Sequence, residues 1–278
     1  MAPRLLHEKS SGSLYVHGTS HHMKLHCLGT AGYHPSATRH TSCYFLPEAG
    51  LMLDAGSGLF RAEQWIDREE ISILLSHAHL DHIFGLTFFL DLMAVTPLRR
   101  IHVYGERAKL EAIQTHLFSE LLFPVVPPIV WHALEDLGHE FSLAGAEIRW
   151  FPLEHPGGSV GFRMQWQSHS LAYVTDTTAK PDSAYWQAIQ GVDWLLHECN
   201  FSDDWIDLAI KTGHSWTSAV LEGASAAHIP RLILTHINPL SVESDPLNLA
   251  AATAKLSQHT PNHILVASDS SVIDLSSL

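Results

Sequence analysis

Residues 76–82 read Ser76-His77-Ala78-His79-Leu80-Asp81-His82 and follow an apolar run at 71–75. Four potential metal ligands therefore lie within six positions, where a buried strand is expected to give way to a helix. Side chains alternate along a strand, so His77 and His79 should point to one side, with Asp81 and His82 facing a second position across the turn. Imidazole suits zinc, and a carboxylate helps to hold a second ion nearby. The cluster indicates a site for metal ions.

Three more candidate ligands follow strand-like runs and precede turn-forming residues, namely His155, Asp176 and His236. A chain with 22 histidines will place some of them together by chance, and most single histidines are ordinary polar residues. The combination of a dense cluster with three further ligands at strand ends favours metal binding over that alternative. Asp176 taken alone could instead cap a turn before Thr177.

Apolar and alternating runs predict the secondary structure around these residues. Strands are expected at 24–29, 42–46, 51–54, 71–76, 101–104, 147–153, 161–166, 171–175, 194–197, 231–235 and 263–267. Helices are expected at 82–95, 107–118, 182–189 and 217–228. Two sheets packed face to face with helices outside would bury all of these apolar faces. The sequence therefore predicts an α/β (α+β) fold, a four-layer αββα sandwich.

Length and composition favour one domain. The chain has 278 residues, of which 46% are hydrophobic, and no linker rich in proline, serine or glycine divides it. Residues 23–278 are expected to form a single domain, after a His- and Ser-rich N-terminal extension at 1–22 that is poorly ordered or derived from cloning.

The sequence also carries signals of location. No apolar run reaches the roughly 20 residues that a membrane span needs, and residues 1–22 lack the apolar core of an export signal. Cys27, Cys43 and Cys199 have no paired spacing, which indicates reduced and buried thiols. We therefore expect a soluble cytoplasmic protein without a membrane partner.

The formal net charge of −13 comes from 29 acidic and 16 basic residues. Tight binding of nucleic acid without regard to sequence depends on Lys and Arg side chains that displace counterions from phosphates. The balance therefore counts against a long polyanionic substrate. A local basic patch could still bind one, and bound metal ions would offset part of the negative charge.

The segment His77-Ala78-His79-Leu80-Asp81-His82 resembles the HxHxDH signature of the metallo-β-lactamase superfamily, and its continuation to Ile83-Phe84-Gly85-Leu86 resembles the tRNase Z branch. The resemblance covers nearly the whole chain from Met23. Further matching pieces follow in the family's order: Leu28-Gly29-Thr30 with Pro35, Arg39 and Ser42, then Leu53-Asp54-Ala55-Gly56, Thr175-Asp176-Thr177, His197-Glu198, His214-Ser215 and Leu234-Thr235-His236.

The resemblance implies a set of metal ligands. His77, His79 and His155 would hold one divalent ion, Asp81, His82 and His236 would hold a second, and Asp176 would bridge the two. The ions would be Zn²⁺, with Mn²⁺ or Fe²⁺ as alternatives, because His and Asp ligands accept all three.

The resemblance also implies catalytic roles for Asp81, His214 and Glu198. A hydroxide between the two ions would attack, His214 would protonate the leaving group, and Glu198 would orient His214. Glu198 could instead be a salt-bridged residue at a strand end, and His214 an ordinary polar residue at a helix start. Arg39 could touch a substrate phosphate or be a plain surface arginine.

Within the superfamily, several features narrow the reaction. True metallo-β-lactamases carry a cysteine where this chain has Asp176, and thioesterases like glyoxalase II lack the His197-Glu198 and His214-Ser215 elements. Only 21 positions separate His155 from Asp176, and a hairpin at 161–175 would nearly fill them. No room is left for the flexible arm with which bacterial tRNase Z enzymes grip tRNA.

We therefore expect a dinuclear metal-dependent phosphodiesterase that acts on a small or short, cyclic or nucleotide-like, phosphodiester. The chain would be similar to the branch that includes a cyclic phosphodiesterase and lacks the tRNA-binding arm. One alternative is a tRNase Z-type endoribonuclease that processes tRNA 3′ ends, and a further one is a non-catalytic metal-binding member of the fold. Relatives in the family are often dimers, so a homodimer is among the expectations.

Overall fold

The computed structural model describes residues 22–241, 244–254 and 261–276. The N-terminal extension expected at 1–22 therefore lies outside the described residues, apart from His22. No helix in the described part of the chain is long and apolar enough to cross a membrane.

The described strands form two seven-stranded sheets. The first sheet has the order β14 (Val272–Asp274), β1 (Lys24–Gly29), β2 (Cys43–Leu46), β3 (Leu51–Leu53), β4 (Glu70–Leu74), β5 (Arg100–Gly105) and β6 (Ile129–Ala133). The second has the order β13 (His263–Val266), β12 (Arg231–Thr235), β11 (Trp194–Glu198), β10 (Ser170–Val174), β9 (Ser159–Gln165), β8 (Ala146–Leu153) and β7 (Glu140–Leu143).

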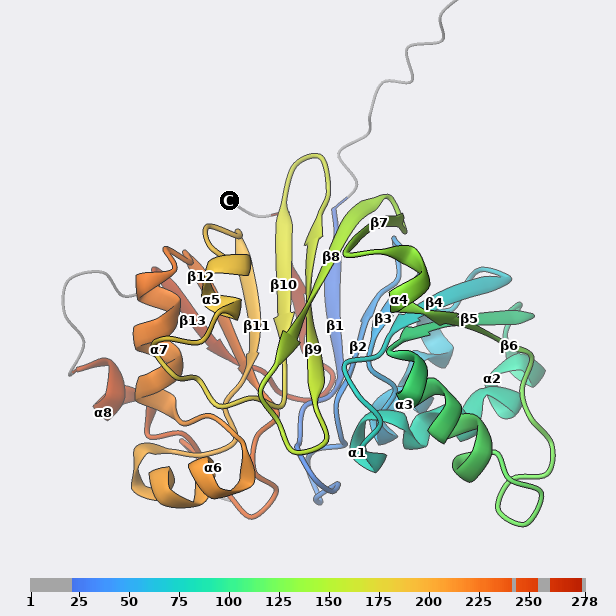
Figure 1. Cartoon of the computed structure of the whole chain (residues 1–278), viewed down its shortest axis with the longest axis horizontal. Helices are drawn as coiled ribbons and strands as arrows, with labels where there is room; N and C mark the ends of the chain where they lie inside the picture. The colour runs from blue at the N-terminus through green and yellow to red at the C-terminus, as the bar shows by residue number, and fades with distance from the viewer. Residues whose placement is uncertain (1–21, 242–243, 255–260, 277–278) are drawn as a thin grey trace, which may run out of the picture.

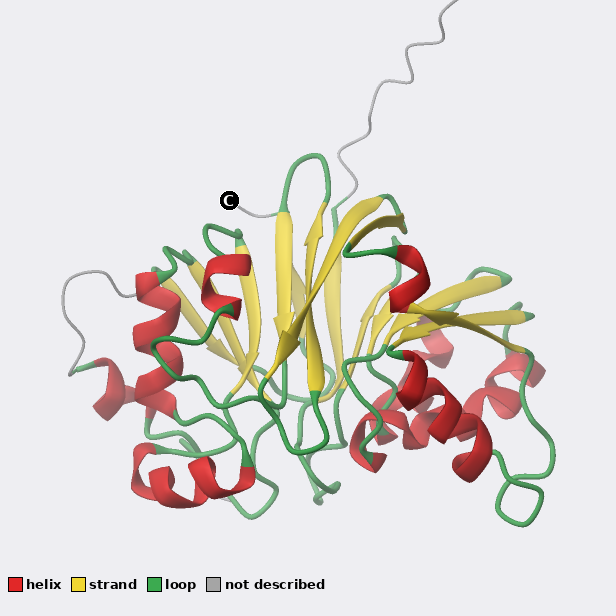
Figure 2. Cartoon of the chain, in the orientation of Figure 1, coloured by secondary structure: helices red, strands yellow, loops and turns green. Residues whose placement is uncertain are grey.

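Helices cover the outer face of each sheet, as Figures 1 and 2 show. The first sheet carries η1 (Ser57–Trp65), α1 (Leu80–Ile83), η2 (Phe84–Phe88), α2 (Phe89–Val95), α3 (Arg107–Ala112) and η3 (Ile113–Leu117), and α4 (Leu134–Leu137) follows β6. The second sheet carries α5 (Tyr185–Ala188), η4 (Asp203–Trp205), α6 (Ile206–Thr212), α7 (Thr217–Ala226) and α8 (Leu249–Thr253). The arrangement is a four-layer αββα sandwich, as the sequence predicted.

Three apolar clusters hold the four layers together. Tyr44 and Phe162 belong to the cluster between the sheets, Phe45 and Phe89 to the cluster beneath the helices of the first sheet, and Leu221 to the cluster beneath the helices of the second. The neighbours Tyr44 and Phe45 lie in different clusters because side chains alternate along β2. Both faces of each sheet are covered, which explains why several strands are apolar at every position.

Each expected strand occurs within one or two residues of its expected bounds, but the expected helices were less accurate. The single helix expected at 82–95 is wrong, because α1, η2 and α2 divide that segment. The division lies where Gly85 packs on the 55–56 turn: its amide donates to the Ala55 carbonyl, and an added Cβ would lie 2.3 Å from the Gly56 carbonyl oxygen. The helix expected at 107–118 becomes a π-helical turn after residue 112, and the one expected at 182–189 is reduced to α5.

Parallel pairing brings the ends of distant strands to one edge of the sandwich. β3 is parallel to β4, β10 to β11 and β11 to β12, and β8 runs with β10 because both are antiparallel to β9. The residues just beyond these strands therefore emerge together, along the lower edge in Figure 1. They include Asp54, His77, His155, Asp176 and His236.

Candidate metal centre

Asp176 lies at the middle of a cluster of histidine and aspartate side chains. Its Oδ2 atom is 3.5 Å from Nε2 of His77 and 3.4 Å from Nε2 of His155. Its Oδ1 atom is 3.1 Å from Nε2 of His82 and 3.2 Å from Nε2 of His236. The two oxygens of one carboxylate thus face two different pairs of imidazoles, an arrangement that allows the carboxylate to be shared by two cations.

Two further side chains extend these pairs. Nδ1 of His79 is 3.3 Å from Nε2 of His155. Oδ2 of Asp81 is 3.4 Å from Nε2 of both His82 and His236. One set of potential ligands is therefore His77, His79, His155 and Asp176, and another is Asp81, His82 and His236. The structure brings together all seven residues that the sequence singled out as metal ligands.

The spacing of these atoms fits divalent cations. Ligand nitrogens and oxygens lie about 2.0–2.2 Å from zinc, so two donors of one tetrahedral site are about 3.3–3.6 Å apart. The separations within the cluster run from 3.1 to 3.5 Å. In addition, Nε2 of His77 is buried and has no hydrogen-bond partner among the described residues, a costly state that a bound cation would relieve.

Asp54 holds the ring of the candidate ligand His82 in place, and the sequence analysis did not identify Asp54 as a site residue. This fully buried carboxylate accepts hydrogen bonds from Nδ1 of His82 at 2.7 Å, from the hydroxyl of Tyr173 at 2.6 Å, and from the amide and hydroxyl of Ser76, both at 2.7 Å. A proton held on Nδ1 leaves Nε2 of His82 free to face Asp176. The available signal was the family-like piece Leu53-Asp54-Ala55-Gly56, in which Asp54 ends an apolar run.

Backbone groups orient two other ligands. Nδ1 of His155 donates to the Gly213 carbonyl at 3.0 Å, which again leaves Nε2 free. Gly213 has φ +77°, and a Cβ there would lie 2.5 Å from Cδ of Pro156. The ring of His236 packs against Gly32, where a Cβ would be 2.4 Å from its Cε1 atom. Only glycine fits at either position.

Three residues of this centre have positive φ although none is glycine. The values are +56° for Asp54, +48° for Asp176 and +57° for His236. Left-handed backbone costs a residue with a side chain about 1 kcal/mol or more, and it persists where the surroundings fix it. Part of the backbone strain of the described residues therefore lies at residues on which the geometry of the cluster depends.

Glu198 and His214 form a pair beside the cluster. Glu198 ends β11, is fully buried, and accepts hydrogen bonds from Nδ1 of His214 at 3.0 Å and from the amides of Thr177 at 2.9 Å and Ser215 at 3.2 Å. Burial lowers the pKa of His214, but the Glu198 carboxylate outweighs it and raises the pKa to about 9. Burial raises the pKa of Glu198, but the neighbouring His214 lowers it by more, so the net shift of the Glu198 pKa is downward. The pair is therefore an imidazolium and a carboxylate.

The imidazolium of His214 is next to the candidate ligands. Its ring centroid is 5.2 Å from the rings of both His155 and His236. Because Nδ1 is bonded to Glu198, Nε2 is the nitrogen left to serve a ligand. His214 can thus present a proton at the edge of the cluster.

Other conspicuous residues have structural roles. Nη1 of Arg39 donates to Oγ1 of Thr30 at 2.6 Å and to the Ala267 carbonyl at 2.5 Å, so the guanidinium is held within the fold. The buried ring of His197 stacks on Trp186 at 9°, and burial lowers its pKa to about 4. His40, His102, His132 and His139 have contacts outside the cluster.

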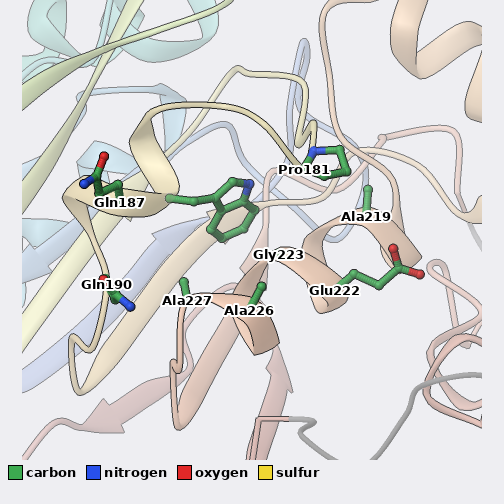
Figure 3. A pocket seen from close by; sticks show the side chains of 9 residues that line it. Pro181, Gln187, Gln190, Ala219, Glu222, Gly223, Ala226 and Ala227 are labelled. Atoms are coloured by element: carbon green, nitrogen blue, oxygen red, sulfur yellow. The ribbon is translucent and has the colours of Figure 1, made fainter.

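A cavity of about 910 Å³ opens onto the cluster. Four of its lining residues are His79, Asp81, His155 and His214, and the others come from the loops after β1, β8, β11 and β12 and from α1 and α6. Figure 3 shows a different cavity of about 370 Å³, between α5 and α7, where Pro181 and Glu222 lie at the wall and no residue of the cluster takes part.

Two packed sheets with a His/Asp cluster at their strand ends define a metallo-β-lactamase fold, and sequence comparison agrees. The β-lactamase superfamily domain matches residues 51–237. The chain belongs to this superfamily and is a hydrolase of the metallo-β-lactamase fold. The family and the fold class expected from the sequence are both confirmed.

Known proteins are similar to this chain over most of its length. Ribonuclease Z of Archaeoglobus fulgidus is 24% identical over 281 residues, which cover 81% of this chain and 90% of that protein. The metallo-β-lactamase fold protein YhfI of Bacillus subtilis has a TM-score of 0.73 at 21% identity, over 91% of this chain and 99% of its own. A diphosphatase of the PhnP family has a TM-score of 0.66 at 19% identity, over 90% and 96%. The likeness to the two structures establishes the fold.

Proposed function

We propose that this chain is a dinuclear metal-dependent phosphodiesterase that hydrolyses a small or short, cyclic or nucleotide-like, phosphodiester. The observation that carries the proposal is the division of the Asp176 carboxylate, whose two oxygens face two separate pairs of imidazoles. His77, His79 and His155 would hold one ion, and Asp81, His82 and His236 the other. The majority of imidazole ligands favours Zn²⁺ over Mn²⁺ or Fe²⁺.

The ions, when bound, would supply a water activated at neutral pH and would offset negative charge on the phosphate. His214 would hold a proton on Nε2 and give it to the leaving oxygen as the ester bond breaks, a contribution of roughly 10²–10⁴ in rate. Glu198 keeps the His214 ring in place and in its charged form. Asp81 lines the cavity and accepts the Tyr33 amide at 2.8 Å, so its carboxylate would also contact the reacting group.

The short length of chain between His155 and Asp176 favours a small substrate. The hairpin of β9 and β10 fills this interval, and the turn that joins the two strands lies at the edge of the sandwich opposite the cluster (Figure 1). No segment between these two residues is left to form an arm over the cavity. A tRNase Z-type endoribonuclease is the second candidate, because curated relatives such as the Archaeoglobus protein are ribonucleases Z.

The test is metal analysis of the purified protein combined with a panel of substrates. We expect two divalent ions per chain and hydrolysis of bis(p-nitrophenyl) phosphate and of small cyclic or dinucleotide phosphodiesters that a chelator abolishes. Faster cleavage of a tRNA precursor, with a rate that falls steeply with salt, would favour the endoribonuclease. Two bound ions without turnover of any phosphodiester would favour the non-catalytic alternative.

We further propose that residues 23–278 form one domain and that the protein is cytoplasmic. The cluster between the sheets joins residues from Met23 to Leu275, which supports a single cooperative unit. Cys27, Cys43 and Cys199 are all free and buried, which agrees with a reducing compartment. A single unfolding transition and separation of cell fractions would test the two statements.

A further inference from the structure

We propose that the substrate is a phosphodiester whose second ester group is apolar, such as an alkyl or aryl group, and that the cavity at the metal centre binds this group. The inference rests on the proposed phosphodiesterase function and names the class of its substrate. It excludes polyphosphates and polynucleotides as preferred substrates.

The lining of the cavity is the first argument. Apart from the cluster residues, most of the wall is apolar: Tyr33, Leu80, Pro156, Phe201, Leu208, Pro239 and Leu240. The remaining polar side chains of the wall are His34, Asn200, Thr212 and Asn238. These residues come from chain segments before β2, after β4, after β8, after β11 and after β12, so several separate parts of the chain contribute to the apolar wall.

The distribution of positive charge is the second argument. None of the described residues that line the cavity is lysine or arginine. Nζ of Lys109 is bonded to the carbonyls of Gly157 and Gly158, and the Arg39 guanidinium is bonded within the fold. The 203–212 segment beside the cavity carries three aspartates, Asp203, Asp204 and Asp207, against one lysine. A metal pair would offset one phosphodiester charge, but apart from the His214 imidazolium further phosphates would meet no cationic side chain on the described cavity wall.

The exposure of the apolar wall is the third argument. The exposed fractions are 80% for Tyr33, 68% for Leu80, 39% for Leu208 and 78% for Leu240. Single exposed apolar residues are common in proteins, but these four line one cavity that also contains the candidate ligands. A concave apolar surface with a few convergent polar groups is the usual form of a small-molecule site. An apolar substituent would cover these side chains while its phosphate lay at the cluster.

A homologous series of esters tests the inference. In methyl, butyl and hexyl p-nitrophenyl phosphate, water attacks phosphorus, p-nitrophenolate leaves, and an alkyl phosphate remains, so only the apolar group changes. With the Zn²⁺-loaded protein below micelle-forming concentrations, we expect kcat/KM to rise by up to about fourfold for each fully buried methylene group. The hexyl ester should exceed the methyl ester by at least about tenfold.

A matched pair of leucine variants locates the effect. Leu208 lines the cavity and is 39% exposed, and Leu265 of β13 is 41% exposed but is not part of the cavity wall. Leu208→Asn should lower the hexyl-to-methyl ratio at least threefold, and Leu265→Asn should leave it unchanged. Both esters are measured on one preparation, so partial misfolding of a variant cancels in the ratio. An equal fall in both variants, or in neither, would overturn the inference.

A binding measurement provides a readout that is independent of turnover. Calorimetric titration with monohexyl phosphate should give tighter binding and a more negative heat-capacity change than titration with inorganic phosphate, because apolar surface is buried. Equal affinity and heat capacity for the two ligands would contradict the inference.

The outcomes separate the inference from the function on which it rests. Chelator-sensitive hydrolysis of all three esters at equal kcat/KM would leave the phosphodiesterase standing and overturn the apolar substrate. No hydrolysis of any ester by protein with two bound ions would overturn both. A higher kcat/KM for thymidine 5′-(p-nitrophenyl phosphate) bearing a 3′-phosphate than for the same compound without it would show a preference for polyanions and overturn the inference alone.

Discussion

Nδ1 of His82 donates a hydrogen bond of 2.7 Å to Oδ2 of Asp54, and both side chains are fully buried. The bond links the turn after β3 to helix α1 and determines which nitrogen of His82 faces Asp176. Partners of this kind raise the basicity of a ligand and hold its ring in orientation. The geometry of the candidate centre therefore depends on Asp54, which orients the ligand His82 but is not itself a proposed metal ligand.

Asp54→Asn should weaken metal binding without removing a ligand. The amide keeps the size of the carboxyl group but loses its charge and one acceptor, and loss of such a partner costs roughly 10–100-fold in metal affinity. Competition with a fluorescent zinc chelator would measure the change. Wild-type affinity in this variant would show that Asp54 serves only the fold.

His79→Ala and Asp81→Ala should each lose metal and activity together, because the number of ligands sets the affinity. His79 is an exposed residue, so its removal should leave the fold intact. Metal content per chain after gel filtration is the measurement. His139→Ala is the control, since the His139 ring stacks on Trp150 away from the cluster. If both ligand variants retained two ions, the assignment of ligands would be wrong.

His214→Ala should keep both ions and slow turnover according to the leaving group. An alkoxide needs a proton as it departs, so we expect a loss of roughly 10²–10⁴ for alkyl leaving groups. A p-nitrophenolate leaves without one and should be affected least. Rates for a series of leaving groups, with metal content alongside, would measure this. The same loss for every leaving group would contradict a role in proton donation.

The pH profile should depend on Glu198. The carboxylate raises the pKa of His214, so the imidazolium persists above the usual range of histidine and is lost as the pH rises through the raised value. For substrates with alkyl leaving groups, the rate should therefore fall on the alkaline side. In Glu198→Gln no carboxylate outweighs the effect of burial, which lowers the pKa of His214. The alkaline fall in rate should therefore move to lower pH by one unit or more. A profile that does not move would show that His214 is not the group that titrates.

Much of this site could be predicted because its ligands follow apolar strands. Strand periodicity placed His77 and His155 at strand ends, and the family likeness supplied their pairing with Asp176. Sequence reasoning missed Asp54, because a single carboxylate after a strand is typical of any turn, and its role depends on Tyr173, 119 positions away. The break in the helix expected at 82–95 was hidden for a similar reason, since it depends on the contact of Gly85 with the 55–56 turn.

Some of the shorter elements could not be predicted from the local sequence pattern either. β14 (Val272–Asp274) is a three-residue edge strand, and β7 (Glu140–Leu143) alternates exposed and half-buried residues. Neither has a run long enough to signal a strand, and each forms because a neighbouring strand offers unpaired backbone groups. α6 (Ile206–Thr212) has only one buried residue, Ala209, so its sequence carries little amphipathic signal.

The central claim is that one carboxylate, Asp176, is shared by two metal ions. Anomalous diffraction at the zinc edge, from crystals of the Zn²⁺-loaded protein, tests it most directly. We predict two peaks, one among His77, His79 and His155 and the other among Asp81, His82 and His236, each in contact with a different oxygen of Asp176. A single peak, or two peaks of which one makes no contact with Asp176, would contradict the account.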